Sequence, residues 1–316
     1  MRLSFENISR GDILSIAKAL TEIENNTPLS EELLQYLLKV KAFTQVIGIT
    51  GPPGSGKSTI VDQMINHYRK NDMSVGVICV DPSSVFSKGA ILGDRIRMQR
   101  HSTDPKVFIR SMATRNVQGG LASGVRKAAF LLQATGHDVV LIETVGVGQI
   151  ELDIVGIADT VIVTAAPGLG DTMQAFKAGV MEVGDIFIVN MADRPEADHT
   201  VRQLTSTLHF TKQNAYWVPK VMKTIATRGD GINDLVAECE NHWKFLQQQE
   251  KLYSKRIETL ENEIKEKLTL KLLKDLSSLF ENGKAHDTAK TVFSGEIQLS
   301  EAVEQIYQLY FQEELR

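Results

Sequence analysis

The chain has 316 residues, of which 42% are hydrophobic and 23% are charged, and its formal net charge is −4 at pH 7. This composition is typical of a globular protein with one large domain and extensions. The slightly acidic balance excludes a general attraction to nucleic acid or acidic membranes. No stretch approaches the roughly 18 apolar residues of a membrane span, and residues 1–12 lack the apolar core of a signal peptide. We therefore expect a cytoplasmic protein with no nucleic-acid or membrane partner.

The two cysteines, Cys79 and Cys239, lie far apart in apolar segments. We expect both to be buried, reduced thiols, because no CxxC pair or His/Cys cluster accompanies them.

The first part of the chain predicts helices. Apolar side chains recur at helical spacing from Ile13 to Leu20 and again from Leu33 to Leu38. We take residues 1–43 as an N-terminal helical extension.

Short apolar runs then alternate with helical segments. The runs are Val46–Thr50, Val75–Asp81, Val107–Ser111, Asp138–Thr144, Thr160–Ala166, Ile186–Asn190 and Pro219–Thr224. Runs without polar alternation suit strands that are covered on both faces, and the helices between them favour right-handed crossovers. Residues 44–244 therefore predict an α/β domain with a doubly wound, mostly parallel sheet, whose ligands bind beyond the carboxyl ends of the strands.

The strand signals stop near Trp243. Between Phe245 and Phe280 apolar residues recur every three to five positions, which predicts one long amphipathic helix, and residues 300–315 are also helical. The apolar stripe needs either the sheet domain or a second subunit to cover it. We favour the second subunit, so we expect residues 245–316 to form the arm of a homodimer.

The string GPPGSGKST at residues 51–59 lies between a predicted strand and a predicted helix. This is the setting of a P-loop, whose glycines let backbone N–H groups wrap round phosphates at a helix N-terminus. Lys57 is expected to reach the β- and γ-phosphates and the Ser58 hydroxyl to bind Mg²⁺. The predicted nucleotide-binding residues of the loop are Gly51, Pro52, Pro53, Gly54, Ser55, Gly56, Lys57, Ser58 and Thr59.

Acidic residues follow the predicted strands. Asp81 closes the second strand, Glu143 closes the fourth, and Asp94 lies in a loop between them. Nucleotide-bound Mg²⁺ takes one or two carboxylates, so these acids are candidate metal ligands, with Ser58. Residues 143–146 also stand where a GTPase has Asp-x-x-Gly, whose glycine N–H contacts the γ-phosphate, so Gly146 is a further candidate.

A guanine-reading motif is predicted at residues 190–193. Asn190 and Asp193 stand at the ends of an Asn-Lys-x-Asp pattern, and a carboxylate at Asp193 can accept both N1–H and N2–H of guanine. Met191 replaces the usual Lys. The run Ile225, Ala226 and Thr227 follows the last strand, where GTPases place a Ser-Ala loop over the base. Here Ile225 replaces Ser, so the strictness of guanine over adenine stays open.

Four arginines, Arg95, Arg97, Arg100 and Arg110, fall near the predicted phosphate edge. One of them could stabilise charge in the transition state, but we favour solvent-facing or partner-facing roles.

The strings GPPGSGKST, VDPSS, ILGDRIRM, ETVGVGQ, PGLGDTMQAFK and NMAD occur in the order and spacing of the MeaB/ArgK family, which the chain resembles from about Phe43 to Trp243. Members of this family are GTPases that accompany adenosylcobalamin-dependent acyl-CoA mutases, typically methylmalonyl-CoA mutase. The resemblance implies GTP and GDP with Mg²⁺ as cofactors, a homodimer, and a chaperone that gates cofactor loading or protection of the mutase.

The resemblance also implies roles for single residues. Asp81, Asp94 and Glu143 would serve Mg²⁺ and the attacking water, with Lys57, Asp94 and Glu143 as the catalytic set. Gln174 and Lys177 would be the polar contacts of a third nucleotide-responsive loop.

Two other functions remain open. One is a metallochaperone GTPase of the nickel-insertion kind, which the seven scattered histidines support poorly. The other is a kinase or ATPase linked to amino-acid transport, as the name ArgK implies. Its partner would be periplasmic, whereas we expect no export signal. The sequence does not identify the client mutase or the hydrolysis rate.

Overall fold

The computed structural model describes residues 4–25, 27–37, 39, 44–82, 98–114, 120–144, 154–168, 181–211, 216–281 and 283–314. The chain divides into two compact units, Met1–Lys255 and Arg256–Arg316. We describe each unit by itself.

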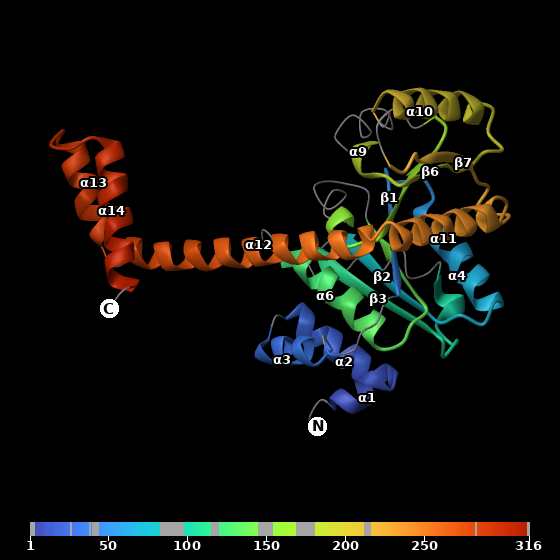
Figure 1. Cartoon of the computed structure of the whole chain (residues 1–316), viewed down its shortest axis with the longest axis horizontal. Helices are drawn as coiled ribbons and strands as arrows, with labels where there is room; N and C mark the ends of the chain where they lie inside the picture. The colour runs from blue at the N-terminus through green and yellow to red at the C-terminus, as the bar shows by residue number, and fades with distance from the viewer. Residues whose placement is uncertain are drawn as a thin grey trace. The chain divides into compact units, whose positions relative to one another are not determined.

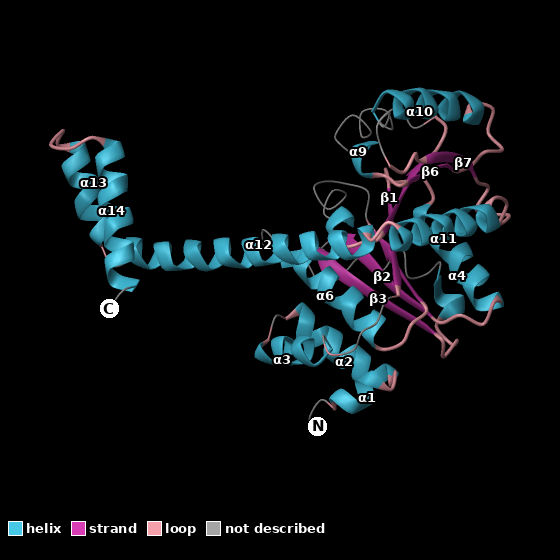
Figure 2. Ribbon diagram, in the orientation of Figure 1, coloured by secondary structure: helices cyan, strands magenta, loops and turns pink. Residues whose placement is uncertain are grey.

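Seven parallel strands form one sheet in the order β3-β2-β4-β1-β5-β6-β7 (Figure 2). Their bounds are β1 Gln45–Thr50, β2 Val75–Pro82, β3 Val107–Thr114, β4 Val139–Glu143, β5 Thr160–Ala165, β6 Ile186–Val189 and β7 Lys220–Lys223. Each strand coincides with a predicted apolar run. The predicted α/β fold class, a P-loop domain with a doubly wound parallel sheet, is confirmed.

Helices cover both faces of this sheet (Figure 1). Helices α4 (Lys57–Lys70) and α11 (Ile232–Gln248) pack on one face, while α6 (Gly120–Ala134) and α10 (Ala197–Thr211) pack on the other. Strand β4 shows why its sequence does not alternate in polarity. Val139 and Leu141 belong to the first core, whereas Val140 and Ile142 belong to the second, so both sets of side chains are buried.

Strand β1 lies at the switch point of the sheet. The chain leaves β1 toward β2 on one side, and after β4 it crosses to β5 on the other side of β1. Ligands of doubly wound sheets bind at such a point, beyond the carboxyl ends of the strands. The residues after β1, β4, β5 and β6 therefore define the carboxyl edge, where a site is expected.

Three N-terminal helices, α1 (Phe5–Ser9), α2 (Ile13–Glu24) and α3 (Pro28–Leu37), extend the second core. Leu20 and Leu33 are fully buried there. Arg110 of β3 donates to Glu24 of α2 at 2.5 Å, so this arginine joins the extension to the sheet.

The predicted helix from Phe245 to Phe280 is wrong at its start. Helix α11 continues to Gln248, and a separate helix, α12, runs over Lys251–Glu281. The break falls at Glu250, whose φ of 55° lies in the left-handed region and stops the helix.

The second unit contains most of α12 together with α13 (Lys284–Phe293) and α14 (Leu299–Glu314). Helices α13 and α14 pack on each other. Along α12, Ile264, Leu268 and Leu273 are each more than half exposed. The remaining short elements are η1 (Gln99–His101), η2 (Ile154–Gly156) and α9 (Met181–Val183). None of the described helices is long and apolar enough to cross a membrane.

Candidate functional site

The loop between β1 and α4 wraps tightly because three glycines adopt positive φ. Gly51, Gly54 and Gly56 have φ values of 139°, 79° and 88°. A Cβ on Gly51 would lie 2.2 Å from the backbone oxygen of Thr164, so the loop approaches β5 at a distance that only glycine allows. This is the geometry that directs backbone N–H groups toward an anion.

Lys57 begins α4 and is largely buried. Its Nζ donates to the carbonyl oxygens of Gly51 at 2.7 Å and Pro52 at 3.1 Å. The ammonium group is therefore held inside the curl of the loop, where a phosphate oxygen could take the place of these carbonyl oxygens.

A row of buried hydroxyl groups lies between the phosphate loop and the ends of the strands. Thr164 Oγ1 donates to the Thr50 carbonyl oxygen at 2.8 Å and lies 3.0 Å from Ser55 Oγ. Thr144 Oγ1 donates to Thr50 Oγ1 at 3.0 Å. These four side chains are almost fully buried, and their mutual hydrogen bonds fix the loop to the ends of β1, β4 and β5. We did not predict this row from the sequence. Its signal there is a threonine near the end of each of three strands, and that pattern becomes meaningful only when the strand order is known.

Ser58 and Glu143 meet at the carboxyl edge. Ser58 Oγ donates to Glu143 Oε1 at 2.5 Å, and both side chains are nearly buried. Cys79 of β2 pairs with Glu143 in the sheet register, so the backbone of Asp81 lies two residues beyond that point at the same edge. Hydroxyl and carboxylate oxygens are the ligands that Mg²⁺ prefers, so the residues present fit this ion.

Asn190 connects the phosphate loop to the loop after β7. Its Nδ2 donates to the Ser55 carbonyl oxygen at 2.9 Å. Its Oδ1 accepts from Thr224 Oγ1 and from the Ala226 backbone N–H, both at 3.1 Å. All four residues are buried, so one amide side chain cross-links three segments at the edge of the sheet.

Met191 follows with a φ of 57°. Its Cε lies 3.9 Å from the position that a Cβ on Gly56 would occupy. The thioether therefore packs near the phosphate loop, although it brings no charge there.

Asp193 is exposed in the turn before α10. The Ala192 N–H donates to the Thr224 carbonyl oxygen at 3.0 Å, which places this turn beside the loop of Ile225, Ala226 and Thr227. Ala226 is buried, Ile225 is half-buried and Thr227 is exposed. The two predicted base-reading segments are thus neighbours.

The remaining residues of the phosphate loop differ in how far they are exposed to solvent. Pro52 is buried, Pro53 and Gly54 are exposed, and Thr59 is half-buried in the first turn of α4.

Several predicted residues cannot be placed. Asp94, Gly146, Gln174 and Lys177 lie outside the described residues, as does the side chain of Asp81.

Arg100 and Arg110 both form ion pairs. Arg100 donates through Nε to Asp62 Oδ1 at 2.8 Å and through its terminal nitrogen to Oδ2, and His101 Nε2 lies 2.9 Å from Oδ1. Asp62 is on α4, so this cluster joins the helix after the phosphate loop to η1. Arg110 binds Glu24, as described above. Arg100 is exposed as well as paired, whereas Arg110 is half-buried. Arg95 and Arg97 lie outside the described residues, so the expected solvent-facing or partner-facing roles stay a prediction.

Both cysteines are buried and form no disulfide. Burial raises the pKa of Cys239, which keeps its thiol protonated and unreactive. Among the residues that the structure describes, no group of three or more His, Cys, Asp or Glu side chains is arranged to hold a metal ion.

Comparisons with known proteins agree with this geometry. The family model described as "Methylmalonyl Co-A mutase-associated GTPase MeaB" matches residues 16–280. A "Putative GTPase" of Pyrococcus horikoshii is 48% identical over 263 residues, which cover 82% of this chain and 83% of that protein. A "Methylmalonic aciduria type A homolog, mitochondrial" of Caenorhabditis elegans is 31% identical over 258 residues, 76% of this chain and 65% of that protein.

A solved structure titled "Crystal structure of LAO/AO transport system kinase" matches with a TM-score of 0.75 and 24% identity. The match covers 96% of this chain and 95% of that one. At this identity it shows the fold alone. The family model spans residues 16–280, and these two relatives are 48% and 31% identical over 82% and 76% of the chain. The chain therefore belongs to the methylmalonyl-CoA mutase-associated GTPase family MeaB and is a nucleotide-binding GTP hydrolase.

Proposed function

We propose that the protein uses GTP binding and hydrolysis to gate the cofactor loading or protection of an adenosylcobalamin-dependent acyl-CoA mutase, with methylmalonyl-CoA mutase as the first candidate. The family description names that mutase as the associated enzyme. The geometric observation that carries the proposal is the contact between Ser58 and Glu143. It joins the phosphate loop to the strand end where GTPases respond to the γ-phosphate.

In this proposal the residues of the carboxyl edge have separate roles in binding and hydrolysis. Lys57 moves from the loop carbonyl oxygens to the β- and γ-phosphates, while Ser58, Asp81 and Glu143 hold Mg²⁺ directly or through water. Asp94 and Glu143 orient the attacking water. Mg²⁺, when bound, supplies positive charge that offsets the charge developing on the phosphates.

The proposed base site consists of the two neighbouring loops that Asn190 fixes. Asp193 accepts N1–H and N2–H of guanine, and the segment 225–227 lies over the base. Because Met191 cannot supply the charge of the usual lysine, binding rests on packing and on Asp193.

We further propose that Gly146 responds to the γ-phosphate and that Gln174 and Lys177 transmit the nucleotide state to the partner. A mutase that binds one nucleotide state better must alter nucleotide affinity in return, by thermodynamic linkage.

We propose three parts of the chain: residues 1–43 as a helical extension, residues 44–244 as the G domain and residues 245–316 as an arm that forms a homodimer. The apolar side chains exposed along α12 support the homodimer, because a C2 interface could cover the same stripe on both copies.

The test is GTP turnover with and without a cobalamin-dependent acyl-CoA mutase from the same genome. We expect the mutase to change the turnover rate or the nucleotide affinity. Gln174→Ala and Lys177→Ala should lower the mutase-stimulated rate more than the basal rate. If saturating mutase leaves both the rate and the affinities unchanged, the coupling is absent and only the GTP hydrolase remains.

A further inference from the structure

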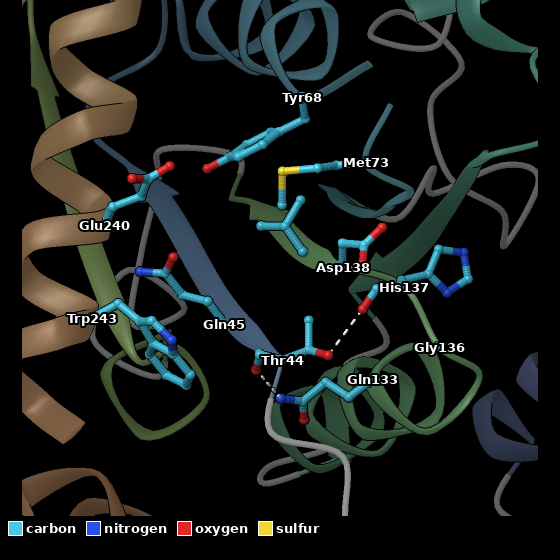
Figure 3. Close-up of a pocket in the computed structure, with 11 residues that line it drawn as sticks. Thr44, Gln45, Tyr68, Met73, Gln133, Gly136, His137, Asp138, Glu240 and Trp243 are labelled. Atoms are coloured by element: carbon cyan, nitrogen blue, oxygen red, sulfur yellow. Dashed lines mark hydrogen bonds between the residues drawn. The ribbon is translucent and has the colours of Figure 1, made fainter. Parts of the chain in front are cut away.

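A pocket of about 370 Å³ lies at the amino edge of the sheet (Figure 3). It is lined by the first residues of β1 and β4, by Tyr68 at the end of α4, and by Glu240 and Trp243 of α11. This volume suits a small ligand. Because β1 crosses the sheet in six residues, the pocket is separated from the phosphate loop by about 20 Å. It is therefore distinct from the nucleotide site.

Tyr68 presents a buried polar group at this pocket. Its side chain is 3% exposed, and its hydroxyl oxygen has no hydrogen-bond partner among the described residues. Figure 3 shows the hydroxyl group directed toward Glu240. Burial raises the pKa of Tyr68, so the hydroxyl keeps its proton and can donate to one group while it accepts from another. Unpaired buried hydroxyls are uncommon in native proteins, and a ligand that enters beside Glu240 would give this one a partner.

The charge of the lining favours a cation. Glu240 and Asp138 contribute carboxylates, and none of the described lining residues is Lys or Arg. His137 adds no positive charge at neutral pH, because burial lowers its pKa. Its Nδ1 donates to the Leu132 carbonyl oxygen at 3.0 Å.

Two glutamine side chains line the pocket. Gln45 Nε2 donates to Thr160 Oγ1 at 3.0 Å and to the Cys239 carbonyl oxygen at 2.9 Å, so both of its hydrogens are used and it offers a ligand only its carbonyl oxygen. Gln133 Nε2 donates to the Thr44 carbonyl oxygen at 2.5 Å and keeps one N–H. The Trp243 indole adds an aromatic surface, which attracts cations through its ring quadrupole.

We propose that this pocket binds a small planar organic cation of the amidinium or guanidinium class, held by the Glu240 carboxylate, the Tyr68 hydroxyl group and the indole of Trp243. The proposal does not depend on the client of the GTPase. Neutral or anionic ligands of the same shape would lack the positive charge that the Glu240 carboxylate selects.

The test uses the full chain and three compounds of nearly the same shape: benzamidine, which is cationic at neutral pH, benzamide and benzoate. The sequence contains two tryptophans, so an ¹⁵N–¹H spectrum shows two indole signals, which Trp217→Phe assigns. Trp217 donates to the Asp185 carbonyl oxygen at 2.8 Å and does not line the pocket. Benzamidine should shift the Trp243 signal saturably and leave the Trp217 signal in place. Benzamide should bind about tenfold more weakly.

Two variants test whether the negative charge of Glu240, and not a negative charge elsewhere on α11, determines the affinity. Glu240 is exposed, so Glu240→Gln should fold normally and weaken benzamidine binding about fivefold, as expected for a half-open ion pair. Asp234→Asn, also exposed on α11 but outside the lining, should not change the affinity. Saturating GDP should also leave it unchanged. Equal binding of benzamide and benzamidine, wild-type affinity in Glu240→Gln, or competition by GDP would each overturn the proposal.

Discussion

Asn190→Ala tests the cross-link between the phosphate loop and the base-reading loops. The substitution removes the donor to the Ser55 carbonyl oxygen and the acceptor for the Ala226 N–H. The Thr224 hydroxyl can turn to another acceptor, but the two backbone groups cannot leave their buried positions. Each buried group without a partner costs about 1–3 kcal/mol, and one water molecule in the vacated space recovers part of this. We therefore expect the free energy of unfolding to fall by about 2–4 kcal/mol.

Urea unfolding followed by circular dichroism measures this loss, and titration with GDP measures its effect on the site. Affinity for GDP should fall together with stability, because Ser55 and Ala226 belong to the two loops that we propose hold the nucleotide. Asn71→Ala is the control, since Asn71 is exposed at the C-cap of α4 and its side chain donates to the His67 carbonyl oxygen in the last turn of that helix. It should change the unfolding free energy by no more than about 0.5 kcal/mol. A loss below about 1 kcal/mol in Asn190→Ala, with unchanged GDP affinity, would refute the cross-link.

Three further predictions follow from other parts of the chain. In competition for the nucleotide site, GTP should bind at least about tenfold more tightly than ATP, and Asp193→Asn should reduce this ratio of affinities. Equal affinities of the wild type for GTP and ATP would show that the guanine site is lost where Met191 replaces lysine. A chain that ends at Lys255 should sediment as a monomer, whereas the full chain should sediment as a dimer at micromolar concentration; a monomeric full chain would contradict the dimer arm. Tyr68→Phe should raise the free energy of unfolding by about 1 kcal/mol, because it removes a buried hydroxyl group without a partner. Since the pKa of Tyr68 is raised in the folded state, the wild type should also lose stability above about pH 10, and the variant should lose less. Unfolding curves at pH 8 and 11 check both effects.

The central strands β1, β4, β5 and β6 could be predicted because they are covered on both faces. Burial of successive side chains, as in Val139, Val140, Leu141 and Ile142 of β4, leaves continuous apolar runs that the sequence displays directly. The phosphate loop could be predicted for a similar reason. Its backbone conformation requires glycine at fixed positions, so a short sequence motif is enough to identify it.

The contacts of the site could not be predicted in the same way. Ser58 and Glu143 are separated by 85 positions, and Asn190 and Ser55 by 135. Their contacts follow from strand order and register, which local patterns do not specify. The pairing of Arg100 with Asp62 is hidden for the same reason. The helix break at Glu250 has no glycine or proline beside it. The helical spacing of apolar residues continues across Glu250, so the sequence gives no sign that the helix ends there.

We place GTP hydrolysis at the carboxyl edge of the sheet, beside the phosphate loop. The most direct test is release of phosphate from GTP by the wild type and by Lys57→Ala, with and without added Mg²⁺. The wild type should turn over GTP only when Mg²⁺ is present. Lys57→Ala should have no detectable turnover, yet it should keep the circular dichroism spectrum and unfolding midpoint of a folded protein, because Lys57 faces the loop and not the apolar core. Wild-type turnover by a folded Lys57→Ala variant would contradict the account.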